Sequence, residues 1–141
     1  MFNFYEFFAG GGMARAGLGT DWTCLFANDF DPKKGVTYQR NWGKGTMLVD
    51  DLRNIAPSDL QGTANLVWGS FPCQDLSVAG NGAGLKGNRS GTFWPFMALL
   101  GELKNEGRAP AMIALENVVG TLTSHQGTDF TAICTALKDL G

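Results

Sequence analysis

The chain has 141 residues, of which 44% are hydrophobic, enough for one domain with a single hydrophobic core. Its formal net charge is −2 and its 11 basic residues form no run, which excludes a strongly basic nucleic-acid-binding face. Three widely spaced cysteines fit neither a disulfide framework nor a Cys-x-x-Cys metal site. With no signal-peptide pattern and no apolar stretch of transmembrane length, we expect a soluble, cytoplasmic domain without a metal.

Short apolar runs alternate with helix-like stretches along the chain. The runs predict five buried strands, at residues 3–8, 22–27, 46–49, 65–68 and 111–115. Pro32 suits the first turn of a helix over residues 32–42. Three-and-four spacing predicts two more helices, whose buried faces carry Phe93, Phe96, Met97, Leu100 and Leu103 in one and Phe130, Ile133, Leu137 and Leu140 in the other. The alternation favours an α/β fold with a doubly wound, mostly parallel sheet and helices on both faces.

One long segment breaks this rhythm. Residues 70–90 have neither helical nor alternating periodicity, and four glycines make them flexible: Gly80, Gly82, Gly84 and Gly87. Loops of this length in compact domains are usually functional, often as lids. We therefore expect this segment to be functional, with its glycine-rich stretch at residues 80–87 closing over a ligand.

A glycine loop follows the first predicted strand, at residues 8–12. Open α/β sheets bind ligands at the carboxyl ends of their strands, and glycine lets the backbone approach a ligand closely. The loop matches neither phosphate-binding pattern, because Arg15 stands where a dinucleotide fingerprint needs a small residue and no Gly-Lys-Ser/Thr follows. Alone, it could equally be a plain tight turn.

Acidic residues follow the second and third predicted strands. Asp29 is placed to accept hydrogen bonds from a ribose diol, and Phe30 could stack on a purine. Asp51 could accept a hydrogen bond from an exocyclic amine. Singly, each aspartate is more simply a helix N-cap or a turn residue. With the glycine loop, they outline a nucleoside pocket that has no phosphate clamp.

Cys73 lies between Pro72 and Gln74 in a turn after the fourth predicted strand. A thiol at the ligand edge of the sheet is a candidate nucleophile, whereas we interpret Cys24 and Cys134 as inert buried residues. A cysteine-histidine hydrolase using His125 is open by spacing. No group in the sequence is an obvious orienter of that imidazole, so we expect His125 to be a surface or capping residue.

Glu116 ends the fifth predicted strand. Partial desolvation there would let its carboxyl group hold or donate a proton. The alternative is a carboxylate that accepts hydrogen bonds from turn amides.

Taken in order, these segments resemble the cytosine-5 DNA methyltransferase family over all 141 residues. Residues 8–12 resemble its first motif, 28–31 its second and 51–52 its third. Gly69-Ser70-Phe71-Pro72-Cys73-Gln74 resembles its catalytic Pro-Cys motif, with Ser77 and Gly80 following as in its loop. Residues 88–91 resemble the fifth motif and Glu116-Asn117-Val118 the sixth.

The resemblance implies S-adenosylmethionine as the cofactor. It implies that Cys73 attacks carbon 6 of a flipped-out cytosine while Glu116 binds N3 and the exocyclic amine. Asp29 would hold the ribose hydroxyls, Asp51 the adenine amine, and Phe30 would cover the adenine. The cofactor-lining residues carried over by position are Phe8, Gly10, Gly12, Asp29, Phe30, Asp51, Leu52 and Pro72.

The sequence departs from the family pattern in three places near the pocket. Met13 replaces a glycine and Glu6 an aspartate, and both could crowd the methionine end. Asp50 replaces the glycine before Asp51, which leaves open which aspartate faces the adenine.

The family continues beyond the equivalent of Gly141 with an arginine motif, a target-recognition domain and a final helix. We therefore expect residues 1–141 to be the N-terminal cofactor and catalytic part of the methyltransferase domain, acting on DNA with a missing C-terminal half or a second subunit. The alternatives are a non-catalytic cofactor- or partner-binding module and a tRNA-methylating relative.

Overall fold

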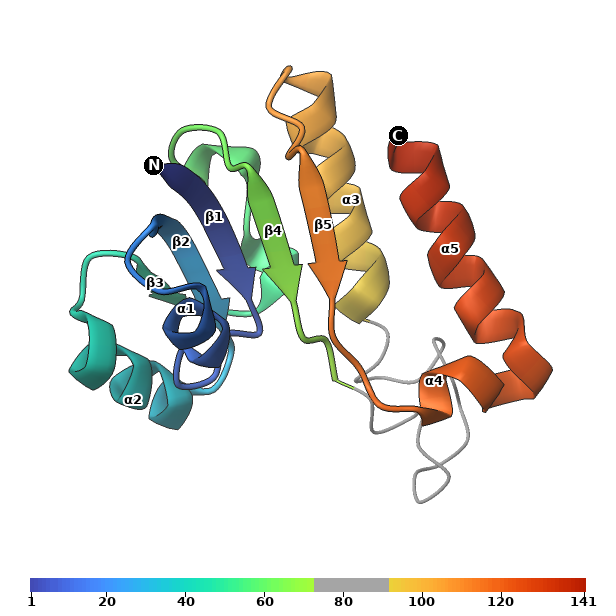
Figure 1. Cartoon of the computed structure of the whole chain (residues 1–141), viewed down its shortest axis with the longest axis horizontal. Coiled ribbons are helices and arrows are strands. Elements are labelled where there is room, and N and C mark those ends of the chain that lie inside the picture. Colours follow the sequence, from blue (N-terminus) through green and yellow to red (C-terminus); the bar gives the residue numbers. More distant parts are fainter. Residues whose placement is uncertain (73–91) are drawn as a thin grey trace.

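The computed structural model describes residues 1–72 and 92–141, which form a five-stranded parallel sheet (Figure 1). The strand order is β3-β2-β1-β4-β5. The bounds are Phe2–Phe7 for β1, Trp22–Asp29 for β2, Met47–Val49 for β3, Leu66–Gly69 for β4 and Met112–Leu115 for β5. All five predicted strands are confirmed, each within two residues of its predicted ends.

The helices are α1 (Met13–Leu18), α2 (Pro32–Trp42), α3 (Phe93–Asn105), α4 (Gly120–Thr123) and α5 (Thr128–Leu140). Short 3-10 turns span Leu52–Asn54, Pro57–Asp59 and Ser124–Gly127. Helix α2 begins as predicted, because the Asp31 carboxylate accepts a hydrogen bond from the Lys33 amide. Helix α1 was not predicted; it is one and a half turns long and buries none of its residues, so it leaves no apolar stripe.

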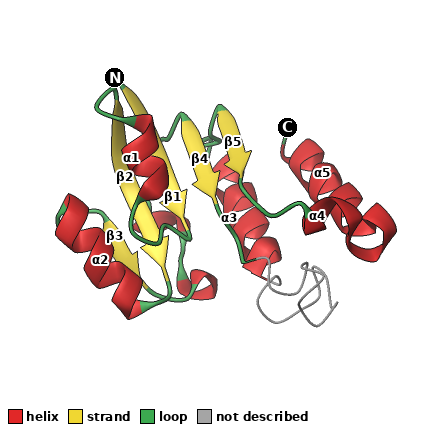
Figure 2. Cartoon of the chain, turned by 60° about the horizontal axis from the view of Figure 1, so that its bottom comes forward, coloured by secondary structure: helices red, strands yellow, loops and turns green. Residues whose placement is uncertain are grey.

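Helices lie on both faces of the sheet, which confirms the doubly wound architecture (Figure 2). Buried side chains form two hydrophobic clusters, and alternate residues of β1 belong to one or the other. Tyr5 and Phe7 pack with Phe96 and Leu100 of α3, whereas Phe4 packs with Tyr38 of α2. This alternation is the expected consequence of a strand buried on both faces. All five predicted core residues of α3 are buried: Phe93, Phe96, Met97, Leu100 and Leu103.

Helix α5 packs less deeply than predicted. Ile133 is buried, and Leu137 and Leu140 are partly buried against the core, but Phe130 is 43% exposed. Cys134 is also exposed, so the prediction that it is buried was wrong. Only one narrow face of α5 meets α3, and Cys134, next to Ile133 in sequence, lies about 100° around the helix from it. Cys24 is buried, as predicted.

The predicted lid, together with Cys73, Ser77 and the motif at residues 88–91, lies outside the described residues. Within residues 1–72 and 92–141, no helix is long and apolar enough to cross a bilayer.

Candidate cofactor and catalytic site

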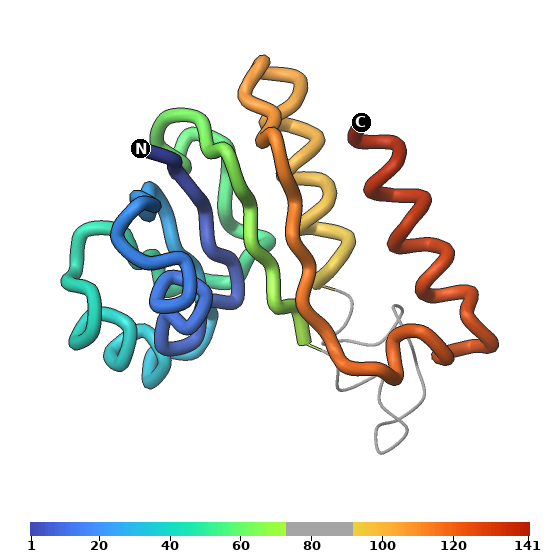
Figure 3. Tube along the Cα trace, viewed as in Figure 1, coloured from blue at the N-terminus to red at the C-terminus, as the bar shows by residue number. Residues whose placement is uncertain are grey.

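The candidate site lies where β1, β4 and β5 end at the same edge of the sheet (Figure 3). Register aligns Glu6 of β1 with Trp68 of β4. Beyond the strand ends, the Ser70 amide donates to the Phe7 carbonyl at 3.4 Å and the Glu116 amide to the Gly69 carbonyl at 3.0 Å. A pocket of about 320 Å³ opens at this edge. The residues that line it are Glu6, Phe8, Ala9, Gly10, Gly11, Met13, Ala14, Trp68, Ser70 and Glu116.

The glycine loop forms one wall of this pocket. Phe8 and Gly10 both have φ of 56°, and a Cβ added to Gly10 would point into open space. Gly12 serves a different purpose: its φ is 86°, and an added Cβ would lie 2.1 Å from Nε1 of Trp42. Gly10 thus borders the pocket, whereas Gly12 lets α2 approach the loop.

Asp29 holds the glycine loop in place. Its carboxylate accepts hydrogen bonds from the Gly10 amide at 2.9 Å and the Asp31 amide at 3.0 Å, and Nζ of Lys34 lies 3.7 Å away. The side chain is only 2% exposed. The observed role of Asp29 is therefore to bind backbone amides, and its contact with a ribose stays a prediction.

The other predicted cofactor residues lie away from the pocket lining. Phe30 is exposed, and Leu52 is buried in the core. Asp51 caps a 3-10 turn through the Arg53 amide and pairs with the Arg53 guanidinium at 3.0 Å. Pro72 is not among the residues that line the pocket.

The two adjacent aspartates are held differently. Asp50 accepts hydrogen bonds from the Asp51 amide and from Nδ2 of Asn54. The side chain of Asp51 is 44% exposed and bonded only locally to Arg53 among the described contacts. The Asp51 side chain is partly exposed but has a local partner on each carboxylate oxygen, so a contact of Asp51 with the adenine amine stays a prediction.

Glu6 is a buried acid at the base of the pocket. It accepts hydrogen bonds from the Arg15 amide and the Tyr38 hydroxyl, each at 3.4 Å. Burial raises the pKa of the Glu6 carboxyl above its usual 4.5. The guanidinium of Arg15 donates to the Tyr38 hydroxyl and lies 4.9 Å from the Trp42 ring centroid. In the sequence, Glu6 stands out only as a departure from a family pattern.

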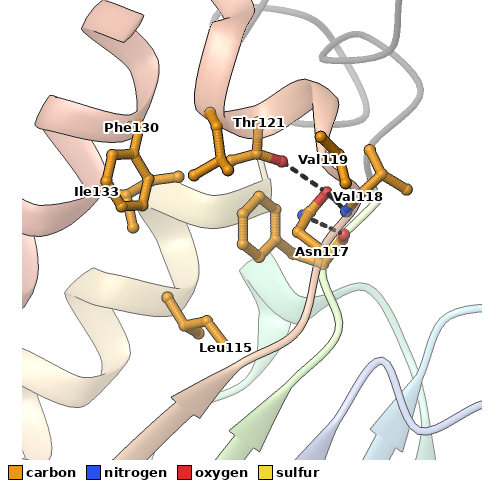
Figure 4. Close-up of a pocket in the computed structure, with 9 residues that line it drawn as sticks. Leu115, Asn117, Val118, Val119, Thr121, Phe130 and Ile133 are labelled. Carbon is orange, nitrogen blue, oxygen red and sulfur yellow. Dashed lines mark hydrogen bonds between the residues drawn. The ribbon is translucent and has the colours of Figure 1, made fainter.

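Glu116 lines the pocket but is exposed, so the expected desolvation of its side chain is not observed. The next residue, Asn117, donates from Nδ2 to the Phe71 carbonyl at 3.0 Å, while its Oδ1 accepts from the Val118 amide and the Thr121 hydroxyl (Figure 4). The first of these bonds joins the end of β5 to the segment that precedes Pro72, and the other two hold the Asn117 side chain locally. The sequence gives no signal for this role of Asn117, because its partner Phe71 lies 46 residues away and is brought close only by the fold.

His125 lies on the exposed turn between α4 and α5, as predicted. Its Nδ1 lies 2.9 Å from Oδ2 of Asp129, so an orienting carboxylate exists that the sequence did not reveal. The imidazole belongs to this surface turn and is not among the residues that line the pocket beside Glu116.

An open parallel sheet with helices on both faces and a pocket at the strand ends define a doubly wound α/β domain, a class that binds ligands at this edge. Residues 2–141 match the family model described as C-5 cytosine-specific DNA methylase, and the chain belongs to this family. The family is one of methyltransferases that use S-adenosylmethionine, which confirms the predicted cofactor.

Curated relatives include the Type II methyltransferase M.Bsp6I of Bacillus sp. (strain RFL6), 35% identical over 118 residues that cover 83% of this chain and 35% of the relative. M.BsuFI of Bacillus subtilis is 32% identical over 98% of this chain and 32% of its own length. The Dnmt2 methyltransferase of S. pombe has the same fold, with a TM-score of 0.76 at 22% identity over 99% of this chain and 42% of that chain. The chain thus spans about a third of the length of these two curated relatives.

Proposed function

We propose that residues 1–141 are the cofactor and catalytic part of an enzyme that transfers a methyl group from S-adenosylmethionine to carbon 5 of cytosine in DNA. The observation that carries the proposal is one pocket shared by the glycine loop, through Phe8 and Gly10, and by Glu116. A pocket of this volume lies at the lower end of the range for small-molecule sites. Cofactor and catalytic acid would thus meet at the edge where Cys73 follows Pro72.

S-adenosylmethionine, when bound, supplies an electrophilic methyl group. We assign its contacts to Phe8 and Gly10 in the pocket and to Asp51 for the adenine amine. Asp51 would exchange its exposed ion pair with Arg53 for the ligand, at little cost because surface pairs are weak. Asp29 supports this site by holding the Gly10 amide.

In the proposed reaction, the Cys73 thiolate adds to carbon 6 of the cytosine and shifts an electron pair towards carbon 5. Glu116 binds N3 and the exocyclic amine, where it stabilises the developing charge. After carbon 5 has gained the methyl group, a base removes the carbon 5 proton, and the electron pair released expels Cys73 and restores the ring double bond. Asn117 fixes the Phe71 carbonyl, and so orders the chain that leads into Pro72 and Cys73.

The charge of the chain bears on how DNA is held. With a net charge of −2 and no basic run, residues 1–141 offer few phosphate contacts. We propose that a C-terminal half or a second subunit supplies target recognition and most of the phosphate contacts. The target cytosine must leave the duplex to reach the pocket.

The first test is isothermal titration of S-adenosylmethionine into the purified chain. We expect saturable binding that weakens in Asp51→Ala and persists in Asp59→Ala, a matched control because Asp59 also holds a backbone amide at a 3-10 turn. A folded chain that binds no cofactor would contradict the proposal.

A second test adds the complementing polypeptide and DNA that contains 5-fluorocytosine, in which the carbon 5 substituent cannot leave as a proton. Covalent trapping of DNA is expected for the wild type and Cys134→Ser, but not for Cys73→Ser. Trapping unaffected by Cys73→Ser would support a non-catalytic module instead. Methyl transfer to tRNA in preference to DNA would support the RNA-modifying alternative.

A further inference from the structure

The pocket has a lining that suits a cation. Two aromatic rings, Phe8 and Trp68, and two acids, Glu6 and Glu116, face it. Among the described residues that line it, none is Lys, Arg or His. Aromatic faces and carboxylates attract positive charge, and tryptophan is the most effective ring for this interaction. The lining therefore favours a positively charged group over a neutral one.

Trp68 is held in a defined position within this lining. It lies on β4 in register with Glu6, one strand away, and its side chain is partly buried. Its indole Nε1 donates a hydrogen bond to Oγ of Ser70 at 2.8 Å. Trp68 and Ser70 are two residues apart, so the pleat places both on the same face. The indole is thus anchored by a neighbour that itself lines the pocket.

We propose that Trp68, anchored by Ser70, is a specificity-determining residue that makes the pocket prefer the charged sulfonium of S-adenosylmethionine to the neutral thioether of the product. This inference rests on the proposed function. The sulfonium carries a fixed positive charge that the sulfur loses when the methyl group leaves. The ring and the two acids then lose their electrostatic partner, so the pocket releases the product more readily than it would with an aliphatic residue at this position.

A purely structural role for Trp68 makes a different prediction. If the ring only filled space, its replacement would weaken cofactor and product by the same factor. The ratio of the two dissociation constants separates these cases, because fold stability and pocket shape affect both ligands alike.

The experiment is calorimetric titration of S-adenosylmethionine and S-adenosylhomocysteine into the purified wild-type chain and its Trp68→Leu, Ser70→Ala and Trp94→Leu variants. Trp94 is a matched control because it is an exposed tryptophan on α3 that packs on Phe93. We expect Trp68→Leu to weaken the cofactor about tenfold more than the product, an effect between those of an exposed and a fully desolvated cation–π contact. Ser70→Ala should shift the ratio in the same direction by a smaller factor, and Trp94→Leu should leave it unchanged.

An unchanged ratio in a folded Trp68→Leu variant overturns the inference and leaves the proposed function intact. A wild-type chain that binds neither ligand overturns both. Circular dichroism checks the fold of each variant. If Trp68→Leu does not fold, Trp68→Phe replaces it in the test, because phenylalanine keeps an aromatic ring of weaker cation affinity and removes the indole N–H. An unchanged ratio of the two dissociation constants in Trp68→Phe also overturns the inference.

Discussion

Nδ2 of Asn117 donates a hydrogen bond to the carbonyl oxygen of Phe71 over 3.0 Å, and this bond joins the ends of β4 and β5 across 46 residues of sequence. Phe71 is buried against Phe93 of α3, so its carbonyl has a fixed position. The same Asn117 side chain accepts from the hydroxyl of Thr121 in α4. One amide therefore sets the geometry of the strand end that precedes Pro72 and Cys73.

Asn117→Ala should destabilise the chain by about 1–3 kcal/mol, because it leaves the Phe71 carbonyl and the Thr121 hydroxyl without these partners. Urea unfolding followed by circular dichroism measures the change. Asn54→Ala is the control, since the Asn54 side chain is exposed and bonds only to Asp50 among the described contacts. Equal effects of the two substitutions would contradict a special role for Asn117.

Local patterns predicted the strands and α2 because their signals are local. An apolar run of four to eight residues indicates a buried strand, and a proline at the first turn indicates a helix start, whatever packs around them. Helix α1 gave no such signal, since none of its residues is buried. The exposure of Phe130 and Cys134 depends on how α5 meets α3, which periodicity alone does not specify.

Positions at strand ends indicated part of the pocket lining, although Asp29 and Asp51, which also follow strands, do not line it. Phe8 and Gly10 were carried over from the family resemblance, Glu116 was a candidate from its place at a strand end, and all three line one pocket. Trp68 was missed because a tryptophan inside an apolar run looks like a core residue; only the register with Glu6 and the bond to Ser70 place it at the pocket. Gly12 is not among the residues that line the pocket, and an added Cβ would meet the Trp42 indole; its contact with the cofactor stays a prediction.

Gly12→Ala should destabilise the chain by about 2–4 kcal/mol, through a disfavoured backbone conformation and a clash with the Trp42 indole. Gly17→Ala is the matched control, because Gly17 lies in α1 and an added Cβ would have no neighbouring atom within 4 Å. We expect the Gly17→Ala variant to be more stable than the wild type by up to about 1 kcal/mol. Thermal unfolding of both variants checks the difference. A Gly12→Ala variant as stable as the wild type would show that the Trp42 indole of α2 moves away from the added Cβ at little cost.

Cys24 and Cys134 should differ sharply in their reaction with iodoacetamide. Burial raises the pKa of the Cys24 thiol, and its Sγ lies 3.4 Å from the Tyr38 hydroxyl, whereas Cys134 is exposed on α5. Peptide mass spectrometry at pH 8 should find Cys134 alkylated early and Cys24 only on unfolding. Fast alkylation of Cys24 in the folded chain would mean that β2 opens readily.

The pH dependence of stability should report Glu6. Its folded pKa is raised above the usual 4.5 by burial, so between these two values the folded state binds more protons than the unfolded state. The contribution of Glu6 to the free energy of unfolding is therefore fully present below about pH 4.5 and is lost as the pH rises through the folded pKa.

Glu6→Gln removes the titration and keeps an oxygen for the Arg15 amide. The unfolding free energy of the wild type minus that of Glu6→Gln, measured in urea at constant ionic strength, should fall as pH rises above 4.5 and then level off. A difference that rose with pH would mean that hydrogen bonds from Tyr38 and Arg15 outweigh the cost of burying the charge.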